Sequence, residues 1–185
     1  IFFKQAKYTL LDQNTFWLCE KPDSVGMVGW DAALTRIATW VKLQDKKTGQ
    51  ILMVVNTHFD HIGTEARRNS ALLIIEKIKE IVGTSPAILT GDFNVSEDWD
   101  AYKTITNNEF ILKDAHKVAG KRTGVDFTYH NFGKIPAEKC EKIDFIFVTP
   151  QIRVISSYIP FSQLNDTLFL SDHNPEIVEL EIEKS

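Results

Sequence analysis

Four clusters of polar side chains lie at or beside predicted strands of this chain, and their types suit the activation of water at a phosphorus centre. Two side chains follow each of the apolar runs 51–55 and 87–89, one interrupts the run 143–148, and two stand in a loop before the alternating segment 178–182. In order, they are Asn56, His58, Asp92, Asn94, Asp144, Asp172 and His173. Because α/β proteins bind ligands where strands of the sheet end, Asp92 and Asn94 indicate a site at the mouth of a sheet.

Each cluster alone has an ordinary structural explanation. An acid and an amide two residues apart are typical of an Asx-turn, a histidine at a strand end is usually structural, and an Asp-His step can begin a helix. Asp144 could be a surface acid on an edge strand, but its apolar neighbours favour burial, and a buried carboxylate needs a partner. The presence of all four clusters in one chain favours a chemical site.

Hydrolysis of a phosphate ester uses this set of groups. The reaction needs a hard divalent cation held by carboxylate and amide oxygens, and a base or orienting group for the attacking water. It also needs donors to the phosphoryl oxygens, and it gains from a histidine held in one tautomer by an acid. Ligands of the Asp, Asn and His types without cysteine fit Mg²⁺ or Mn²⁺ better than a structural zinc ion.

The segments that must position these groups alternate between strand and helix. Strands are predicted at 36–43 and, after a turn at 45–49, at 51–55, where unbroken apolar character indicates burial on both faces. Thr64 is the predicted N-cap of a helix that ends at Gly83. Its predicted buried face comprises Ala71, Ile74, Ile75, Ile78 and Val82.

Further strands are predicted at the two ends of the chain. Short strands at 1–3 and 15–18 flank a turn at 12–14, and longer ones cover 143–148, 152–159 and 178–182. No domain boundary is evident, so we expect a single α/β domain over residues 1–185.

Composition limits the class of protein. The chain has 185 residues, a net charge of −4 and 25% charged residues, which argues against a broad basic surface for nucleic acid. A metal ion can still supply the positive charge that meets a phosphate. Cys19 and Cys140 lack metal-ligand spacing and are expected to be free thiols. No apolar run reaches the length of a membrane span.

Four motifs, taken in order, resemble the endonuclease/exonuclease/phosphatase superfamily, which has the DNase I fold. They are Asn56-Thr57-His58, Gly91-Asp92-Phe93-Asn94, Ile143-Asp144-Phe145-Ile146 and Ser171-Asp172-His173. The segment Trp30-Asp31-Ala32-Ala33 together with Arg36 is similar to an uncharacterised, largely bacterial branch. The resemblance implies a four-layer α/β sandwich of the DNase I-like type with two mixed sheets, here lacking N-terminal strands. It also implies a metal-dependent phosphoester hydrolase.

The resemblance assigns catalytic roles. Asp92 would orient or deprotonate the attacking water, and Asn94 would contact the phosphate. His173 would contact the scissile phosphate with Asp144 as its carboxylate partner. His58 would be a phosphate contact or the acid that protonates the leaving group.

The resemblance also assigns the metal and part of the substrate contact. Asp172 looks like a metal ligand, with Asp92 and Asn94 completing the set around Mg²⁺ or Mn²⁺. Arg36 stands where some members place an arginine near the substrate, although an exposed strand residue is an equal alternative.

The resemblance narrows the substrate and the partners less than it narrows the site residues. We expect a phosphate-ester substrate (nucleic acid, nucleotide or lipid headgroup) and no obligate protein partner. A phosphodiesterase is preferred; a phosphomonoesterase and a non-catalytic phosphate-binding module are the alternatives. Aromatic residues in the loops 21–35, 61–66 and 117–140 would suit stacking on a base or sugar, although loop aromatics are as often packing residues. They are Trp30, His61, Tyr129, His130 and Phe132.

The family also has an Asn, and a metal-binding Glu within a Gln-Glu pair, on strands before the region where this chain begins. No Gln-Glu pair occurs here. The sequence therefore resembles the C-terminal two-thirds of such an enzyme. For this segment alone we expect weak metal binding, low activity and self-association, because unpaired sheet edges associate.

Overall fold

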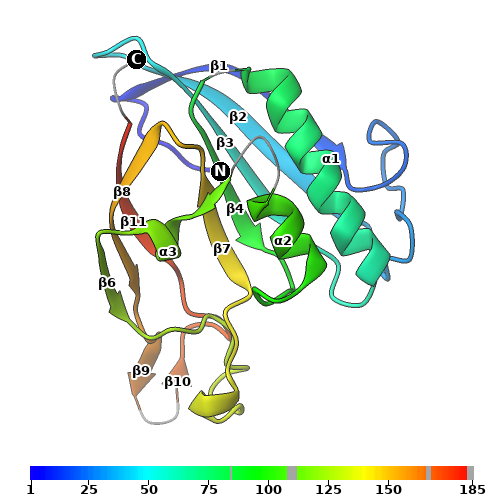
Figure 1. Cartoon of the computed structure of the whole chain (residues 1–185), viewed down its shortest axis with the longest axis vertical. Coiled ribbons are helices and arrows are strands. Elements are labelled where there is room, and N and C mark those ends of the chain that lie inside the picture. The colour runs from blue at the N-terminus through cyan, green and yellow to red at the C-terminus, as the bar shows by residue number, and fades with distance from the viewer. Residues whose placement is uncertain (84, 108–111, 166–167, 183–185) are drawn as a thin grey trace.

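The computed structural model describes residues 1–83, 85–107, 112–165 and 168–182. In these ranges a six-stranded mixed sheet forms the centre of the molecule, with the strand order β1-β2-β3-β4-β7-β5 (Figure 1). Its strands are β1 (Tyr8–Trp17), β2 (Ile37–Asp45), β3 (Ile51–His58), β4 (Ala87–Asp92), β7 (Asp144–Val148) and β5 (Lys113–Asp114). Strands β3 and β4 are parallel, and the other neighbours are antiparallel.

Helices cover one face of this sheet. They are α1 (Thr64–Val82), which connects the parallel strands β3 and β4, and α2 (Asp100–Thr106) beside it (Figure 1). The predicted buried face of α1 is confirmed, since all five of its residues are buried. They pack against Met53 and Val55 of β3 and Leu89 of β4 within one hydrophobic cluster. This core fixes the central strands whose ends carry the polar clusters.

A second core lies on the opposite face of the sheet. It is closed by the sheet β11-β8-β6, made of β11 (Ile177–Ile182), β8 (Ile152–Ile159) and β6 (Lys121–Gly124). Leu52 of β3 and Val148 of β7 pack there against Ile152 and Val154 of β8. Strand β3 is therefore buried on both faces, as its unbroken apolar run predicts.

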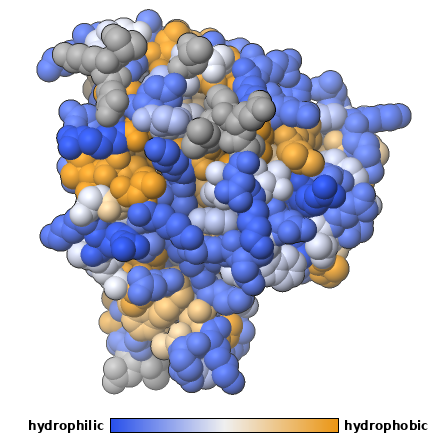
Figure 2. All heavy atoms as spheres, in the orientation of Figure 1, coloured by the Kyte–Doolittle hydropathy of each residue, from blue (hydrophilic) through white to orange (hydrophobic). Residues whose placement is uncertain are grey.

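The remaining elements are short. They are α3 (Ala115–Val118), the 3₁₀ turn η1 (Ala137–Lys139) and the pair β9 (Gln163–Asn165) and β10 (Leu168–Phe169). β9, β10 and η1 form a lobe below the main body, where hydrophobic side chains reach the surface (Figures 1 and 2). Exposed large side chains in this region include Phe161, Leu164, Leu168 and Leu170.

Three local predictions are wrong. Residues 1–3 are not a strand, and the predicted turn at 12–14 lies inside β1, because its pairing with β2 continues past it with a register shift between Leu10 and Asp12. Helix α1 begins at Thr64, so its N-cap is Gly63, which has no capping side chain. The Asp31 carboxylate accepts the free N–H groups of Glu65 and Ala66 instead.

The predicted fold class is confirmed. The chain is α/β, with helices, a mixed six-stranded sheet and a second mixed sheet in layers. Of the helices in the described ranges, none combines the length and apolar character needed to cross a bilayer.

Candidate active site

Three strands of the central sheet deliver polar side chains to one edge. His58 ends β3, Asp92 ends β4 and Asp144 begins β7. The strand register pairs His58 with Asp92, and Asp92 with Asp144, so the three residues lie side by side. This arrangement requires glycine at position 91. Its φ is +155°, which other residues rarely adopt, and a Cβ atom there would collide with the carbonyl oxygen of Thr57.

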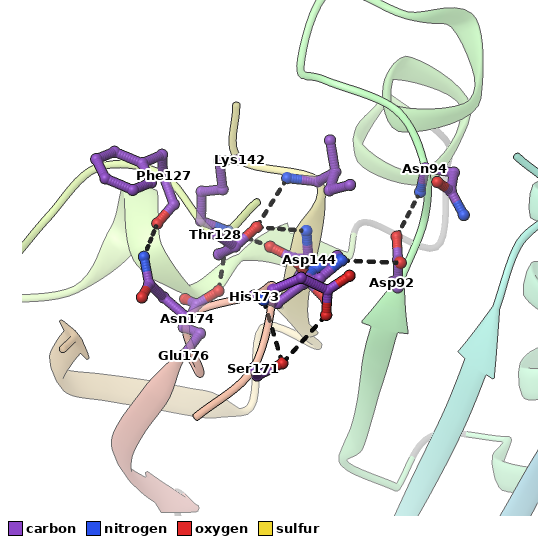
Figure 3. Close-up of polar contacts among 12 residues, drawn as sticks. Asp92, Asn94, Phe127, Thr128, Lys142, Asp144, Ser171, His173, Asn174 and Glu176 are labelled. Carbon is purple, nitrogen blue, oxygen red and sulfur yellow. Dashed lines mark hydrogen bonds and ion pairs between the residues drawn. The ribbon is translucent and has the colours of Figure 1, made fainter. Parts of the chain in front are cut away.

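The segment after β10 brings the fourth group. His173 Nδ1 lies 2.7 Å from Asp144 Oδ2, and since a carboxylate accepts only, the imidazole N–H is the donor (Figure 3). The predicted contact between Asp144 and His173 is thereby confirmed. This hydrogen bond raises the pKa of the His173 imidazole above its usual value, although partial burial opposes the rise. The other ring nitrogen, Nε2, faces Asp92 Oδ2 at 4.0 Å.

Asp92 lies between two histidines. Its Oδ2 atom is 3.4 Å from His58 Nε2, and its Oδ1 atom accepts the backbone N–H of Asn94 at 2.9 Å. Burial raises the pKa of the Asp92 carboxyl, and the negative charge of Asp144 raises it further. Partial burial lowers the pKa of the His58 imidazole, and Arg36 adds to this effect. The site thus holds the Asp92 carboxylate, whose pKa is raised, between two different histidines. The pKa shifts favour the protonated form of His173 and the neutral form of His58.

Asn94 has a structural role that its sequence position also suggests. The residue takes φ of +50° in the Asx-turn after β4. Its side-chain N–H₂ donates to the carbonyl oxygen of Phe59 at 3.0 Å. That bond ties the loop after β4 to the loop after β3. Its predicted contact with phosphate stays a prediction.

Arg36 is fixed beside His58 by a buried carboxylate. Both residues line one small cavity of about 280 Å³, and Arg36 Nε lies 3.6 Å from Asp60 Oδ2. Arg36 Nη2 also lies 3.1 Å from His61 Nδ1. Asp60 is 1% exposed, and its carboxylate accepts the backbone N–H groups of Ala33, Leu34, Ile62 and Gly63. Arg36 thus lies beside His58, largely buried and just before β2, and its predicted contact with substrate stays a prediction.

The site offers carboxylate oxygens for a metal ion. Among the described residues, Asp92, Asp144 and His173 offer ligand atoms within 4.8 Å of one another. Two carboxylates fit a hard cation. Asp172 adjoins this group, and its negative charge also raises the pKa of His173, but its carboxylate Oδ1 accepts the hydroxyl of Ser171. Its role as a metal ligand stays a prediction.

Sequence reasoning missed the residues that hold Asp144 and His173. Thr128 is buried, and its hydroxyl oxygen accepts the N–H groups of Ile143 and Asp144 (Figure 3). Asn174 is 1% exposed and donates its backbone N–H to the Thr128 carbonyl at 2.7 Å. Lys142 and Glu176 form a buried ion pair next to both segments. In the sequence, the short run 127–129 around Thr128 does not indicate these contacts.

Of the five residues predicted to stack, His130 is buried and Tyr129 packs on a catalytic-site ring. His130 is 1% exposed and packs against Phe161 and Phe169, so it cannot stack on a ligand. Tyr129 packs on the His173 ring, with centroids 4.9 Å apart. Phe132 is exposed. His61 is also exposed and Trp30 is partly buried, so stacking by Trp30, His61 and Phe132 stays a prediction.

Solved structures resemble this chain closely. It is 64% identical to an endonuclease/exonuclease/phosphatase from Bacteroides vulgatus, with a TM-score of 0.94 over 98% of this chain and 69% of that one. It is 34% identical to a mannosyl-6-phosphatase from Bacteroides thetaiotaomicron, with a TM-score of 0.88 over 97% of this chain and 69% of that one.

A curated relative and a family model match as well. An uncharacterized protein of Acanthamoeba polyphaga mimivirus is 30% identical over 175 residues, and the match covers 89% of this chain but only 63% of that relative's length. The family model described as Endonuclease/Exonuclease/phosphatase family matches residues 7–173. The four predicted motifs lie within this match. The chain therefore belongs to the endonuclease/exonuclease/phosphatase family of phosphoester hydrolases.

Proposed function

We propose that this chain carries the catalytic centre of a metal-dependent phosphatase that acts on a small phosphomonoester. The observation that carries the proposal is the unbroken set of contacts from His58 through Asp92 and His173 to Asp144. A module that only binds phosphate has no need of a basic carboxylate between two histidines. The set therefore supports an enzyme over the binding alternative.

Asp92 would orient and deprotonate the attacking water. A general base works best when its pKa is close to the operating pH, and burial together with Asp144 moves the pKa of Asp92 in that direction. The backbone N–H of Asn94 holds Oδ1, which leaves Oδ2 directed towards the histidines. Oδ2 is thus the atom that would accept the proton.

The two histidines would have different tasks. His173 donates from Nδ1 to Asp144, so its Nε2–H can donate to a phosphoryl oxygen, and its raised pKa favours the charged form. The lowered pKa of His58 favours the neutral imidazole. A neutral ring suits a hydrogen bond to the phosphate better than proton donation to a leaving group. Of its two expected roles, contact is therefore the one we propose for His58.

The carboxylates would hold Mg²⁺ or Mn²⁺. Asp92 and Asp144 offer oxygens within the same small group, with Asn94 and Asp172 as the further ligands expected from the family. When bound, the ion would polarise the phosphoryl group and lower the pKa of its water. His173 is already engaged at Nδ1, so we assign it to the phosphate and not to the ion.

Three observations favour a small monoester, and a sugar phosphate in particular. The relative from Bacteroides thetaiotaomicron, at 34% identity, is named a mannosyl-6-phosphatase. His130, one of the residues expected to stack on a base, is buried in an aromatic cluster. The cavity beside His58 is lined by Thr35, Thr39, Asn56 and Arg36, which are groups that hydrogen-bond hydroxyls.

The test compares the rates at which the protein hydrolyses a phosphate monoester and a phosphate diester. Mannose 6-phosphate and bis-p-nitrophenyl phosphate would be assayed with Mg²⁺, with Mn²⁺ and with EDTA. We expect turnover of the monoester that EDTA abolishes. Faster turnover of the diester would support the phosphodiesterase instead, and phosphate binding without any turnover would support the binding module.

Variants link the activity to the site. Asp92→Asn should abolish turnover, because the amide cannot take the proton from water. Asp23→Asn is the matched control, since Asp23 lies exposed in the loop before β2. Equal activity of the two variants would refute the assignment of Asp92.

A further inference from the structure

A buried ion pair lies directly behind the pair of Asp144 and His173. Lys142 Nζ is 2.9 Å from Glu176 Oε2, and the two side chains are 7% and 3% exposed. The Lys142 ammonium group also lies 3.9 Å from the centre of the Phe145 ring. The proposed reaction assigns no role to Lys142 or Glu176.

The ion pair joins the two segments that carry the active-site pair. Lys142 lies two residues before Asp144, and its Nζ donates to the Asp144 carbonyl oxygen at 2.8 Å. Glu176 lies three residues after His173, beyond the buried Asn174 (Figure 3). A line of contacts therefore runs from the backbone of Asp144 through Lys142 to Glu176 and back along the chain to His173.

The same carboxylate is anchored in the second sheet. Glu176 Oε1 accepts the hydroxyl of Ser157 on β8 at 3.2 Å, and Ser157 Oγ lies 2.8 Å from His116 Nδ1. Ser157 is fully buried and His116 nearly so. Glu176 is thus anchored to β8 directly and to α3 through Ser157.

Stability alone does not explain this ion pair. Burying two charges costs more than their attraction commonly returns, and well-packed apolar residues often replace such pairs without loss. In keeping with this, burial raises the pKa of the Glu176 carboxyl even though Lys142 opposes the rise. A charge pair that is costly to bury, adjoining a functional pair, fits a requirement for fixed geometry.

We infer that Lys142 and Glu176 are positioning residues that set the geometry of the hydrogen bond between Asp144 and His173. Catalytic groups must be held within a fraction of an ångström, and a misplacement of 1 Å can cost about 10²-fold in rate. The inference rests on the proposed function for its effect on turnover. Its effect on the hydrogen bond itself does not depend on that function.

Two variants test the positioning role, one that removes both charges and one that keeps them but moves the carboxylate. Lys142→Met/Glu176→Met replaces the pair by apolar groups and leaves no unpaired charge. Glu176→Asp keeps both charges but withdraws the carboxylate by one methylene. We expect each variant to lower kcat, the double variant by about tenfold or more, with KM changed less than about threefold. The resonance of the His173 Nδ1 proton, observed by NMR, should shift in both.

The control is an exposed ion pair between strands β8 and β11. The side chains of Arg153 on β8 and Glu181 on β11 are 63% and 59% exposed. Glu181→Asp withdraws that carboxylate by one methylene, as Glu176→Asp does in the buried pair. It should leave kcat and the His173 resonance unchanged. The inference is overturned if Glu176→Asp folds with wild-type kcat and an unshifted His173 proton. If the parent enzyme hydrolyses no phosphate ester, the proposed function fails, and the His173 resonance still decides the inference.

Discussion

Replacing Asp60 by asparagine tests whether this buried carboxylate organises the substrate side of the site. In the protein, Oδ2 accepts the N–H groups of Ala33 and Leu34 at 3.1 Å, and Oδ1 accepts those of Ile62 and Gly63 at 2.9 and 2.8 Å. Asparagine has one acceptor oxygen and one N–H₂ group. The N–H₂ group of the asparagine must therefore face one of the two pairs of backbone N–H groups, which then lose their acceptor. We expect that pair to be Ala33 and Leu34, which lie more exposed.

The size of the loss follows from those contacts. A hydrogen bond to a charged group contributes about 1.5–3 kcal/mol, so losing two would cost about 3–6 kcal/mol. Ala33 and Leu34 lie exposed at the surface, where water can replace part of the loss. We therefore expect Asp60→Asn to lower the free energy of unfolding by about 2–4 kcal/mol. Arg36 also loses its charged partner, so KM should rise.

Urea denaturation at several pH values measures this effect. Burial alone would raise the pKa of Asp60, but the surrounding N–H groups outweigh it and hold that pKa below its usual value. A carboxyl of lowered pKa stabilises the fold above its unfolded-state pKa, and this contribution is lost as the pH falls through its folded-state pKa. The difference between parent and variant should thus be constant near neutral pH and shrink below about pH 4.

Asp45 supplies the matched control. Its carboxylate accepts the N–H groups of Lys47 and Thr48 in the exposed turn between β2 and β3. Asp45→Asn should therefore cost much less than Asp60→Asn. A loss below about 1 kcal/mol for Asp60→Asn, or equal losses for the two variants, would refute the reasoning.

The other predictions concern the reacting groups and the strand that carries Asp92. His173→Ala should lower kcat on the order of 10²-fold or more without unfolding the protein, and near-normal kcat would remove His173 from the mechanism. Asp144→Asn should lower the pKa of His173, because burial then acts without the opposing carboxylate; an NMR titration that shows an unchanged pKa would contradict the pairing. Since the charged form of His173 is the one we propose to act, the alkaline limit of kcat should move to lower pH in that variant. Gly91→Ala should cost about 3 kcal/mol or more, because the new methyl group meets the Thr57 carbonyl oxygen, and a wild-type melting temperature would contradict this.

Parts of the fold that depend on local pattern were predictable. The buried face of α1 and the two-sided burial of β3 follow from apolar spacing, which the cores require. The apolar neighbours of Asp144 predicted only that this acid needs a partner, and the resemblance of the motifs to the family identified His173 as that partner. In each case the information lies in one short segment or in a motif.

Features that depend on distant partners were not predictable from local pattern. Residues 12–14 have turn propensity, but pairing with β2 draws them into β1. Thr64 has the chemistry of an N-cap, yet Asp31 reaches the helix terminus from another loop. Nothing near Lys142 in the sequence indicates Glu176 as its partner, since only the completed fold brings the two together.

The order in which strands pair has a consequence for how the protein acquires activity. The parallel pair β3 and β4 can form once α1 has folded, because that helix is the short connection between them. The pairing of β4 with β7 closes a much longer loop, and long loops close slowly because their entropy is lost before contacts form. Asp144 and His173 join Asp92 only after that closure. An intermediate with a formed helical layer should therefore already resist proteolysis over α1 while it has no catalytic site, so enzymatic activity should be the last property to recover on refolding.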